Sequence, residues 1–316
     1  MIVMTLDGSS TESRETTPVP GTPDDPAPAG QPVPSGEPRR WLRRPWARLI
    51  VLLVVFVLID IVVGAVGQGL DSVPVVGLPV GIVLAALVLL AYVKVIGLVE
   101  HREPAELARD GAVAEVNRGT LLGIALFTAC IGIIAMFGGY RAGWGSIGAM
   151  LTTFGLMCAV ASAEELIFRG VLFRIVEEMA GTWGALIVSA LIFGALHLVN
   201  PDATVWGALG IAIEGGLMAG AAYAATRSLW LPIGIHLGWN FAEGGIFGVT
   251  VSGSHGTVGL LEGRLPGSAV LTGGSFGPEA SLVAILICGI PTVLFLRLAA
   301  RRGRIRPRSR RAPVES

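Results

Sequence analysis

The sequence predicts an all-α polytopic transmembrane helical bundle of about eight spans, and two observations support this prediction. Hydrophobic residues make up 53% of the chain and charged residues only 15%, with a mean hydropathy of +0.71. This composition is typical of helices whose outer faces contact lipid, and it lies outside the range of water-soluble enzymes. The apolar residues also gather in runs of spanning length: 49–67, 78–99, 119–139, 148–163, 183–199, 203–226, 228–249 and 281–299.

The chain begins with a segment of a different kind. Residues 1–38 are rich in Pro, Ser, Thr, Gly and Asp, and repeated prolines block helix formation. We therefore expect residues 1–45 to form a disordered, Pro-rich cytoplasmic tail. The segment lacks the basic start and apolar stretch of a cleavable signal peptide.

Arginines flank both ends of the apolar region. By the positive-inside rule they place both termini in the cytoplasm, which requires an even number of spans and agrees with eight. A position beside a membrane span also explains these arginines better than a role in binding nucleic acid. We therefore expect the protein to contact membrane lipid and not to bind nucleic acid. The arginines are Arg39, Arg40, Arg43, Arg44 and Arg48 before the first run, and Arg301, Arg302, Arg304, Arg306, Arg308, Arg310 and Arg311 after the last.

Charge and glycine content mark the connections between the runs. Residues 46–118 are expected to hold the N-terminal transmembrane helices and a charged cytoplasmic connection over 100–118 that carries a surface helix. Residues 250–280 are Gly- and Ser-rich and are expected to form a long extracytoplasmic loop, and residues 300–316 a basic cytoplasmic tail.

The first polar motif reads Glu164-Glu165-Leu166-Ile167-Phe168-Arg169. Ionisable residues inside a membrane cost about 2.5–3.5 kcal/mol each on insertion scales, so they are rare without a function. Glu165 and Arg169 are four residues apart and share a helix face, which predicts that they pair. Glu164 is rotated by about 100° from its neighbour, so its carboxylate is free to face a cavity. Taken alone, the motif is equally compatible with an interfacial ion pair.

Two further motifs place histidines in apolar runs, although the chain holds only four histidines. His197 follows Phe193 by one turn, which predicts an aromatic wall for the imidazole. His236 and Asn240 are four residues apart and therefore co-facial. Each of these motifs also fits an interhelical hydrogen bond with no catalytic part.

Together the three motifs indicate acid–base chemistry on a bound water in a cavity shared by several helices. An HExxH motif is absent from the sequence. We expect Glu164 to be the general base and His197 to position or deprotonate the water. His236 and Asn240 would donate hydrogen bonds to the oxyanion of a tetrahedral intermediate.

These motifs resemble those of the CPBP family of intramembrane proteases, which includes the type II CAAX prenyl endopeptidases and the Abi bacteriocin-processing proteins. The family pattern has an EExxxR block, an FxxxH block and an HxxxN-type block, and all three occur here in order. The resemblance covers about residues 119–299. It implies a CPBP-type endopeptidase, a metallo- or glutamate hydrolase, that cleaves peptide or protein substrates at the membrane. By position it implies that Glu164 is catalytic, that Glu165 and Arg169 support it, and that His197, His236 and Asn240 complete the site.

The sequence leaves several alternatives open. Glu164, His197 and His236 could hold one divalent metal such as zinc, whereas a glutamate mechanism needs none. Intramembrane acids and histidines are also found in transporters, and the fold could serve as a non-catalytic bacteriocin-immunity or scaffold protein. Isolated acids at Asp60, Glu214 and Glu243 have no predicted role, although Glu243 could extend the polar face of His236.

One geometric problem accompanies the site. In straight helices Glu164 lies near the cytoplasmic side, while His197 comes about 21 Å into an outward-running span. We expect the helix that carries Glu164 to continue past Arg169 before it leaves the bilayer, because an amphipathic pattern extends to Met179.

Overall fold

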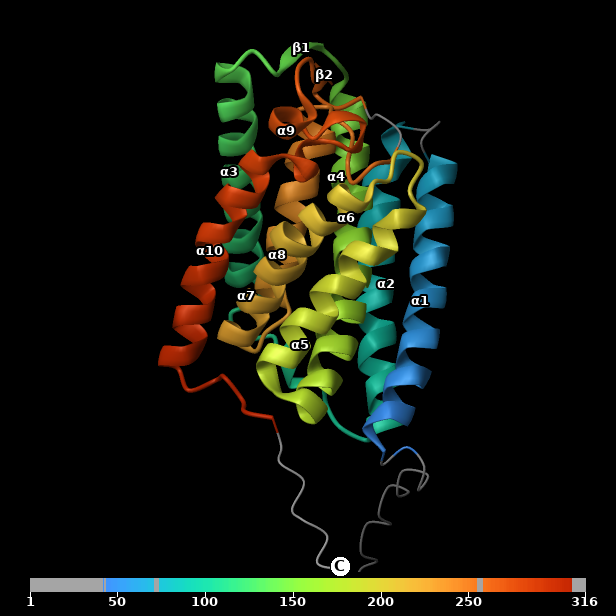
Figure 1. Cartoon of the computed structure of the whole chain (residues 1–316). Coiled ribbons are helices and arrows are strands. Elements are labelled where there is room, and N and C mark those ends of the chain that lie inside the picture. The colour runs from blue at the N-terminus through green and yellow to red at the C-terminus, as the bar shows by residue number, and fades with distance from the viewer. Residues whose placement is uncertain (1–41, 43, 71–73, 255–257, 309–316) are drawn as a thin grey trace, which may run out of the picture. The chain divides into compact units, whose positions relative to one another are not determined.

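The computed structural model describes residues 42, 44–70, 74–254 and 258–308. The predicted tail of residues 1–45 lies outside the described residues except at its end, and so do residues 309–316. The described chain is almost entirely helical, which confirms the all-α prediction (Figure 1).

Helices follow one another along the chain with short 3₁₀ and π segments, labelled η, between them. The elements are α1 (Pro45–Leu70), α2 (Pro74–Glu100), η2 (Ala105–Leu107), α3 (Ala112–Met136), β1 (Arg141–Trp144), α4 (Ile147–Glu165), η3 (Leu166–Phe173), α5 (Arg174–Leu196), η4 (His197–Val199), α6 (Val205–Ile211), η5 (Ala212–Leu217), α7 (Met218–Thr226), α8 (Trp230–Asn240), η6 (Phe241–Ile246), β2 (Leu261–Arg264), α9 (Ala269–Thr272), η7 (Gly274–Phe276), η8 (Pro278–Ala280) and α10 (Leu282–Arg301).

Six helical stretches among the described residues are long and apolar enough to cross a membrane. They are Pro45–Gly69, Val76–Glu100, Ala112–Met136, Ile147–Val199, Val205–Thr226 and Leu282–Arg301. The number is lower than the eight predicted runs for two reasons. The stretch Ile147–Val199 contains both 148–163 and 183–199, and the run 228–249 forms the shorter helix of α8 and η6. With many large apolar side chains exposed on its helices, the protein is a multi-pass membrane protein.

The long stretch Ile147–Val199 is two helices joined at Gly181. The first helix runs through α4 and η3 into α5 without interruption. Gly181 then adopts φ 74° and ψ 174°, a conformation that breaks the helix and that glycine tolerates best. The helix that carries Glu164 therefore does continue past Arg169, as the amphipathic pattern to Met179 predicted.

The charged connection after α2 is shorter than predicted. Gly111, with φ 74°, precedes α3, so Glu115 and Arg118 belong to the first turns of that helix. The predicted surface helix is replaced by the single turn η2. Charged residues at the membrane-proximal end of a spanning helix account for the polar pattern that suggested a separate element.

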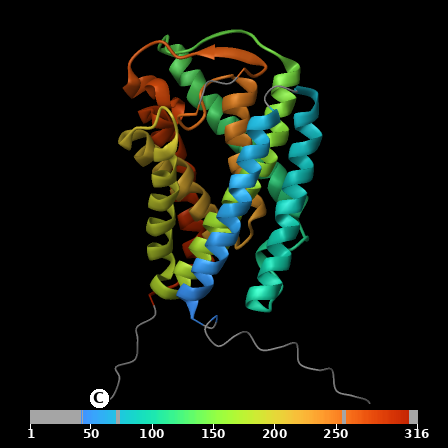
Figure 2. The same cartoon turned by 90° about the vertical axis from the view of Figure 1, so that its right-hand side faces the viewer.

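The two ends of the bundle differ in structure. At one end α1 begins and α10 ends (Figure 1), and residues 302–308 dock on the Gly181 turn, where Thr182 N donates to Arg306 O at 3.0 Å. At the other end β1 and β2 pair antiparallel, with Arg141 opposite Arg264 (Figures 1 and 2). Part of the predicted loop over 250–280 is therefore regular structure.

Small residues allow α3 and α8 to pack closely. A Cβ added to Gly123 would lie 2.3 Å from Ile235 O, and one added to Gly238 would lie 2.1 Å from Thr120 O. Glycine at such contacts lets helix backbones approach in a membrane, where no hydrophobic effect drives them together. This contact fixes α8, which carries two of the predicted site residues.

Candidate active site

The predicted site residues come from three parts of the chain. Glu164 and Glu165 end α4, and Arg169 lies in the π segment η3. His197 begins η4 directly after α5, while His236 and Asn240 lie on α8. Segments of π-helix are found frequently at functional sites because they interrupt the regular hydrogen-bond ladder.

Glu165 and Arg169 form a fully buried ion pair. Arg169 Nη1 donates to Glu165 Oε1 at 2.6 Å, and the two side chains are 1% and 0% exposed. Arg169 Nη2 also donates to the carbonyls of Gly215 at 2.9 Å and Gly216 at 3.0 Å, both in the π segment η5. The guanidinium thus ties α4 and η3 to η5, while its Nε has no hydrogen-bond partner among the described residues.

His236 joins this pair from α8. Its Nδ1 lies 3.0 Å from Glu165 Oε1, and its Nε2 lies 3.9 Å from Glu164 Oε2. Because a carboxylate only accepts hydrogen bonds, Nδ1 carries a proton and donates it to Glu165. The second ring nitrogen then faces Glu164.

His197 is oriented by its own helix. Its Nδ1 lies 2.8 Å from the carbonyl oxygen of Phe193, which can only accept, so the proton of the neutral ring sits on Nδ1. The lone pair of Nε2 is then free to accept a proton. The Phe193 ring lies edge-on at 5.0 Å from the His197 ring and 6.1 Å from the His236 ring. Phe193 is therefore the predicted aromatic wall, and it serves both imidazoles.

Two adjoining cavities meet at these residues. An outer cavity of about 280 Å³ is lined by Glu164, His197 and Asn240, together with Thr153, Met157, Val160, Leu196, Asn200, Val251, Ser252 and Ser254. An inner cavity of about 30 Å³ is lined by Glu165, His236 and Phe193, and also by Ile211, Glu214, Gly215, Met218, Ala219, Ile235, Trp239 and Glu279. His197, Asn240 and Ser252 line both cavities. Of the six predicted residues, Arg169 alone lines neither cavity, and it contacts Glu165, which lines the inner cavity.

Several polar residues beside the site had no predicted role. Glu214 and Glu279 line the inner cavity and are 3% and 2% exposed. Glu243 is fully buried and lines neither cavity, so it does not extend the polar face of His236 into them. Asp60 on α1 lies within electrostatic range of Glu164 and His236. In the sequence, each of these four residues stands out only as an acid in or next to an apolar run. Which of these acids lie together in the fold depends on tertiary packing.

The described side chains do not form a metal-ligand set. No group of three or more His, Cys, Asp and Glu side chains among them is arranged to hold a metal ion. This includes Glu164, His197 and His236, the three ligands that the sequence suggested for zinc. Glu164 lines the outer cavity, His236 lines the inner cavity, and His197 lines both.

Comparison with known proteins finds a similar family. Residues 120–242 match the family model described as type II CAAX prenyl endopeptidase Rce1-like. No curated protein and no solved structure matches the chain. The matched segment begins in α3, ends in η6 and includes all six predicted site residues. The segment that carries the six predicted site residues is therefore similar to the Rce1-like type II CAAX prenyl endopeptidases, a family of membrane proteases, which supports the resemblance seen in the sequence.

Proposed function

We propose that this protein is an intramembrane endopeptidase that hydrolyses peptide bonds of membrane-associated peptides or proteins with a water activated by Glu164 and His197. The observation that supports this most directly is that Glu164, His197 and Asn240 line one cavity, although they come from three different helices. Each side chain has a free polar group available there for water or a peptide carbonyl.

In the proposed reaction a water lies between the Glu164 carboxylate and Nε2 of His197. Glu164 removes a proton as the water oxygen attacks the peptide carbonyl, and the carbonyl oxygen becomes an oxyanion. Asn240 Nδ2 donates a hydrogen bond to that oxyanion. Glu164 then gives its proton to the leaving amine as the C–N bond breaks, which restores the carboxylate.

In the proposed reaction His236 can donate a hydrogen bond to the oxyanion only when its ring is positively charged. With Nδ1 donating to Glu165, a neutral His236 ring presents a lone pair at Nε2 and cannot donate to an oxyanion. An imidazolium can donate from both nitrogens, and it would balance the charges of Glu164, Glu165 and Arg169 to zero. We therefore propose that His236 acts as a cation that faces Glu164 and the oxyanion.

The outer cavity suggests an extended, partly apolar substrate. Met157, Val160, Leu196 and Val251 supply apolar walls, and Asn200, Ser252 and Ser254 supply polar groups. The family description names prenylated CAAX substrates, but these walls fit apolar peptide side chains as well. The class of substrate we propose is therefore a peptide or protein at the membrane, with or without a prenyl group.

The test compares purified wild type with Glu164→Gln in proteoliposomes that contain bacterial membrane peptides and a prenylated CAAX peptide. New peptide termini should form with wild type and not with Glu164→Gln. Glu262→Gln is a matched control, because Glu262 is exposed on β2 and lines neither cavity, and this variant should cleave like wild type. Equal cleavage by wild type and Glu164→Gln would reject the mechanism.

One observation favours a transporter as the second candidate. Glu214, Glu243 and Glu279 are buried in the bundle, and two of them line the inner cavity. Buried intramembrane acids mark ion and proton pathways. Proton flux through proteoliposomes that survives Glu164→Gln but is lost in Glu214→Gln would support transport.

A further inference from the structure

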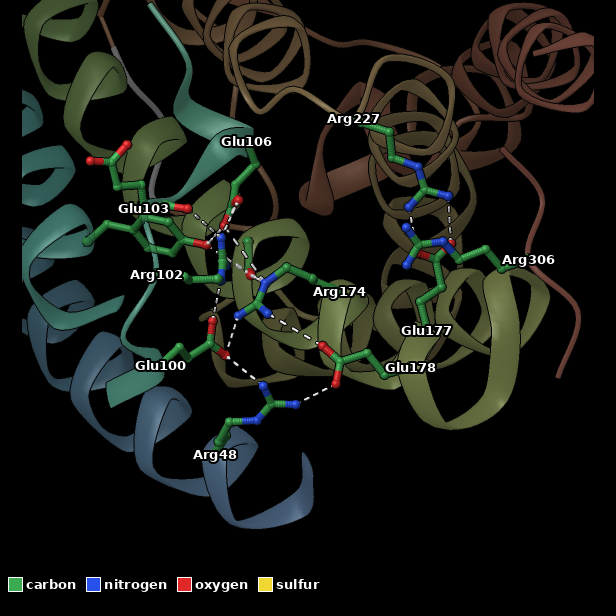
Figure 3. Close-up of polar contacts among 12 residues, drawn as sticks. Arg48, Glu100, Arg102, Glu103, Glu106, Arg174, Glu177, Glu178, Arg227 and Arg306 are labelled. Atoms are coloured by element: carbon green, nitrogen blue, oxygen red, sulfur yellow. Dashed lines mark hydrogen bonds and ion pairs between the residues drawn. The ribbon is translucent and has the colours of Figure 1, made fainter. Parts of the chain in front are cut away.

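A buried turn outside the Rce1-like segment contacts two of the three parts of the chain that carry the site, η3 and α8. Glu106 lies in η2, and its side chain is 5% exposed. Arg102 Nη2 donates to Glu106 Oε1 at 2.7 Å and Nη1 donates to Oε2 at 2.8 Å, so the carboxylate is held by both arms of the guanidinium (Figure 3). Paired bonds of this kind fix geometry as well as adding stability.

Glu106 reaches the active-site helix through Tyr92. The Tyr92 hydroxyl lies 2.6 Å from Glu106 Oε1 and 3.0 Å from the carbonyl oxygen of Gly170. Gly170 directly follows Arg169 in η3, and Arg174 Nε donates to the same carbonyl at 2.8 Å. A Cβ on Gly170 would lie 2.8 Å from the Tyr92 hydroxyl oxygen, so only glycine permits this approach. Arg174 and Tyr92 thus both contact the η3 backbone one residue after Arg169, and the single Tyr92 proton is shared between Glu106 and Gly170.

The same turn also holds the start of α8. Leu229 N donates to the backbone carbonyl of Glu106 at 2.9 Å, and Trp230 Nε1 donates to the carbonyl of Ala108 at 2.8 Å. Leu229 directly precedes α8, the helix of His236. The side chain of Glu106 therefore acts on one active-site helix while its backbone acts on the other.

An ionic network fixes this turn to three further helix ends. Arg174 on α5 pairs with Glu100 at 2.8 Å, and Glu100 also pairs with Arg48 of α1 at 3.6 Å (Figure 3). Arg48 in turn pairs with Glu178 on α5. The turn is thus attached to α1, α2 and α5 at the end of the bundle where the Gly181 reversal lies.

We infer that Tyr92 and Glu106 are positioning residues, which hold η3 and α8 in the register that brings Glu165 within 3.0 Å of His236. The inference rests on the proposed function for its effect on rate. Neither side chain lines the two cavities, so Tyr92 acts through Gly170, and Glu106 acts through Tyr92 and, by its backbone, through Leu229. A displacement of about 1 Å at such a distance from the chemistry can cost as much as a hundredfold in rate.

Tyr92→Phe tests the inference, because it removes one hydroxyl and leaves the ring in place. We expect faster hydrogen exchange over residues 166–173, a kcat lower by about ten- to a hundredfold, and an unchanged KM. Glu106→Ala should act in the same direction, and Glu106→Gln should restore part of the rate because its amide oxygen can still accept from Tyr92. Tyr140→Phe is the matched control, since that hydroxyl also donates to a backbone carbonyl, of Phe247 at 2.9 Å, next to β1 at the opposite end.

Wild-type exchange over 166–173 together with a wild-type kcat in Tyr92→Phe would overturn the inference. The same loss of rate in Tyr140→Phe would overturn it too, because the effect would then be general. If wild-type protein cleaved no peptide, the proposed function would fail, yet faster exchange over 166–173 in Tyr92→Phe alone would still support the positioning role.

Discussion

Arg169→Ala should destabilise the protein at least as much as it harms catalysis. The guanidinium is 1% exposed, pairs with Glu165 at 2.6 Å and donates to two backbone carbonyls of η5. Its removal leaves the Glu165 carboxylate buried without its cation, and breaking a buried pair in this way costs about 3–5 kcal/mol. Against a total stability of about 5–15 kcal/mol for a typical domain, such a loss lowers the amount of folded protein in the membrane.

The measurement is the thermal unfolding of detergent-purified protein, together with its abundance in membranes. Arg264→Ala is the control, because Arg264 and Glu262 form an ion pair that is 80% and 51% exposed, and such pairs contribute about 1 kcal/mol or less. Combining Arg169→Ala with Glu165→Gln should recover part of the stability, since the unpaired charge is removed. An Arg169→Ala protein with wild-type stability and abundance but no activity would refute this reasoning and assign Arg169 a direct catalytic part.

Four other predictions follow from the geometry. Glu164→Gln should abolish cleavage, whereas Asn240→Ala should retain a rate about 10²–10³-fold lower in a peptide-cleavage assay, because it removes one oxyanion donor. Gly123→Ala should reduce membrane abundance by forcing α3 away from α8, and Gly132→Ala on the same helix should not, since a Cβ there meets nothing within 4 Å. Burial alone would raise the pKa of the Glu106 carboxyl, but hydrogen bonds from Arg102 and Tyr92 outweigh this effect and lower that pKa. The stability that the Glu106 carboxylate adds should therefore be full above about pH 4.3 and should fall as the pH drops further. Melting curves of wild type and Glu106→Gln should accordingly converge in acid. Cysteine labels placed just before α1 and just after α10 should both react from the cytoplasm, and reaction from opposite sides would contradict the proposed orientation.

Local spacing was enough to predict the contacts made within one helix. Glu165 and Arg169 share a face because they are four residues apart, and the structure pairs them at 2.6 Å. His197 and Phe193 have the same spacing, and their rings lie 5.0 Å apart. In each case a single helical turn places the two groups, so no knowledge of the tertiary fold is needed.

Contacts between helices could not be predicted in this way. The segments η3 and η5 are π-helical, and their apolar pattern does not differ from that of an α-helix. The donation from Arg169 to Gly215 and Gly216 depends on these segments meeting. The approach of Glu279 to the inner cavity likewise depends on how the chain returns after β2, since Glu279 lies in η8, about 115 residues after Glu164 in the sequence.

The two adjacent glutamates differ in ways that support different roles for them. Glu165 is fully buried, and one of its oxygens accepts from both Arg169 and His236. A carboxylate held by two donors in this way links α4 to η3 and to α8. Glu164 is only partly buried, lines the outer cavity, and has no hydrogen-bond partner for Oε2 among the described residues. Glu164 therefore meets the geometric requirement of the general base that we propose, which is a carboxylate beside a cavity with an oxygen that no described donor holds.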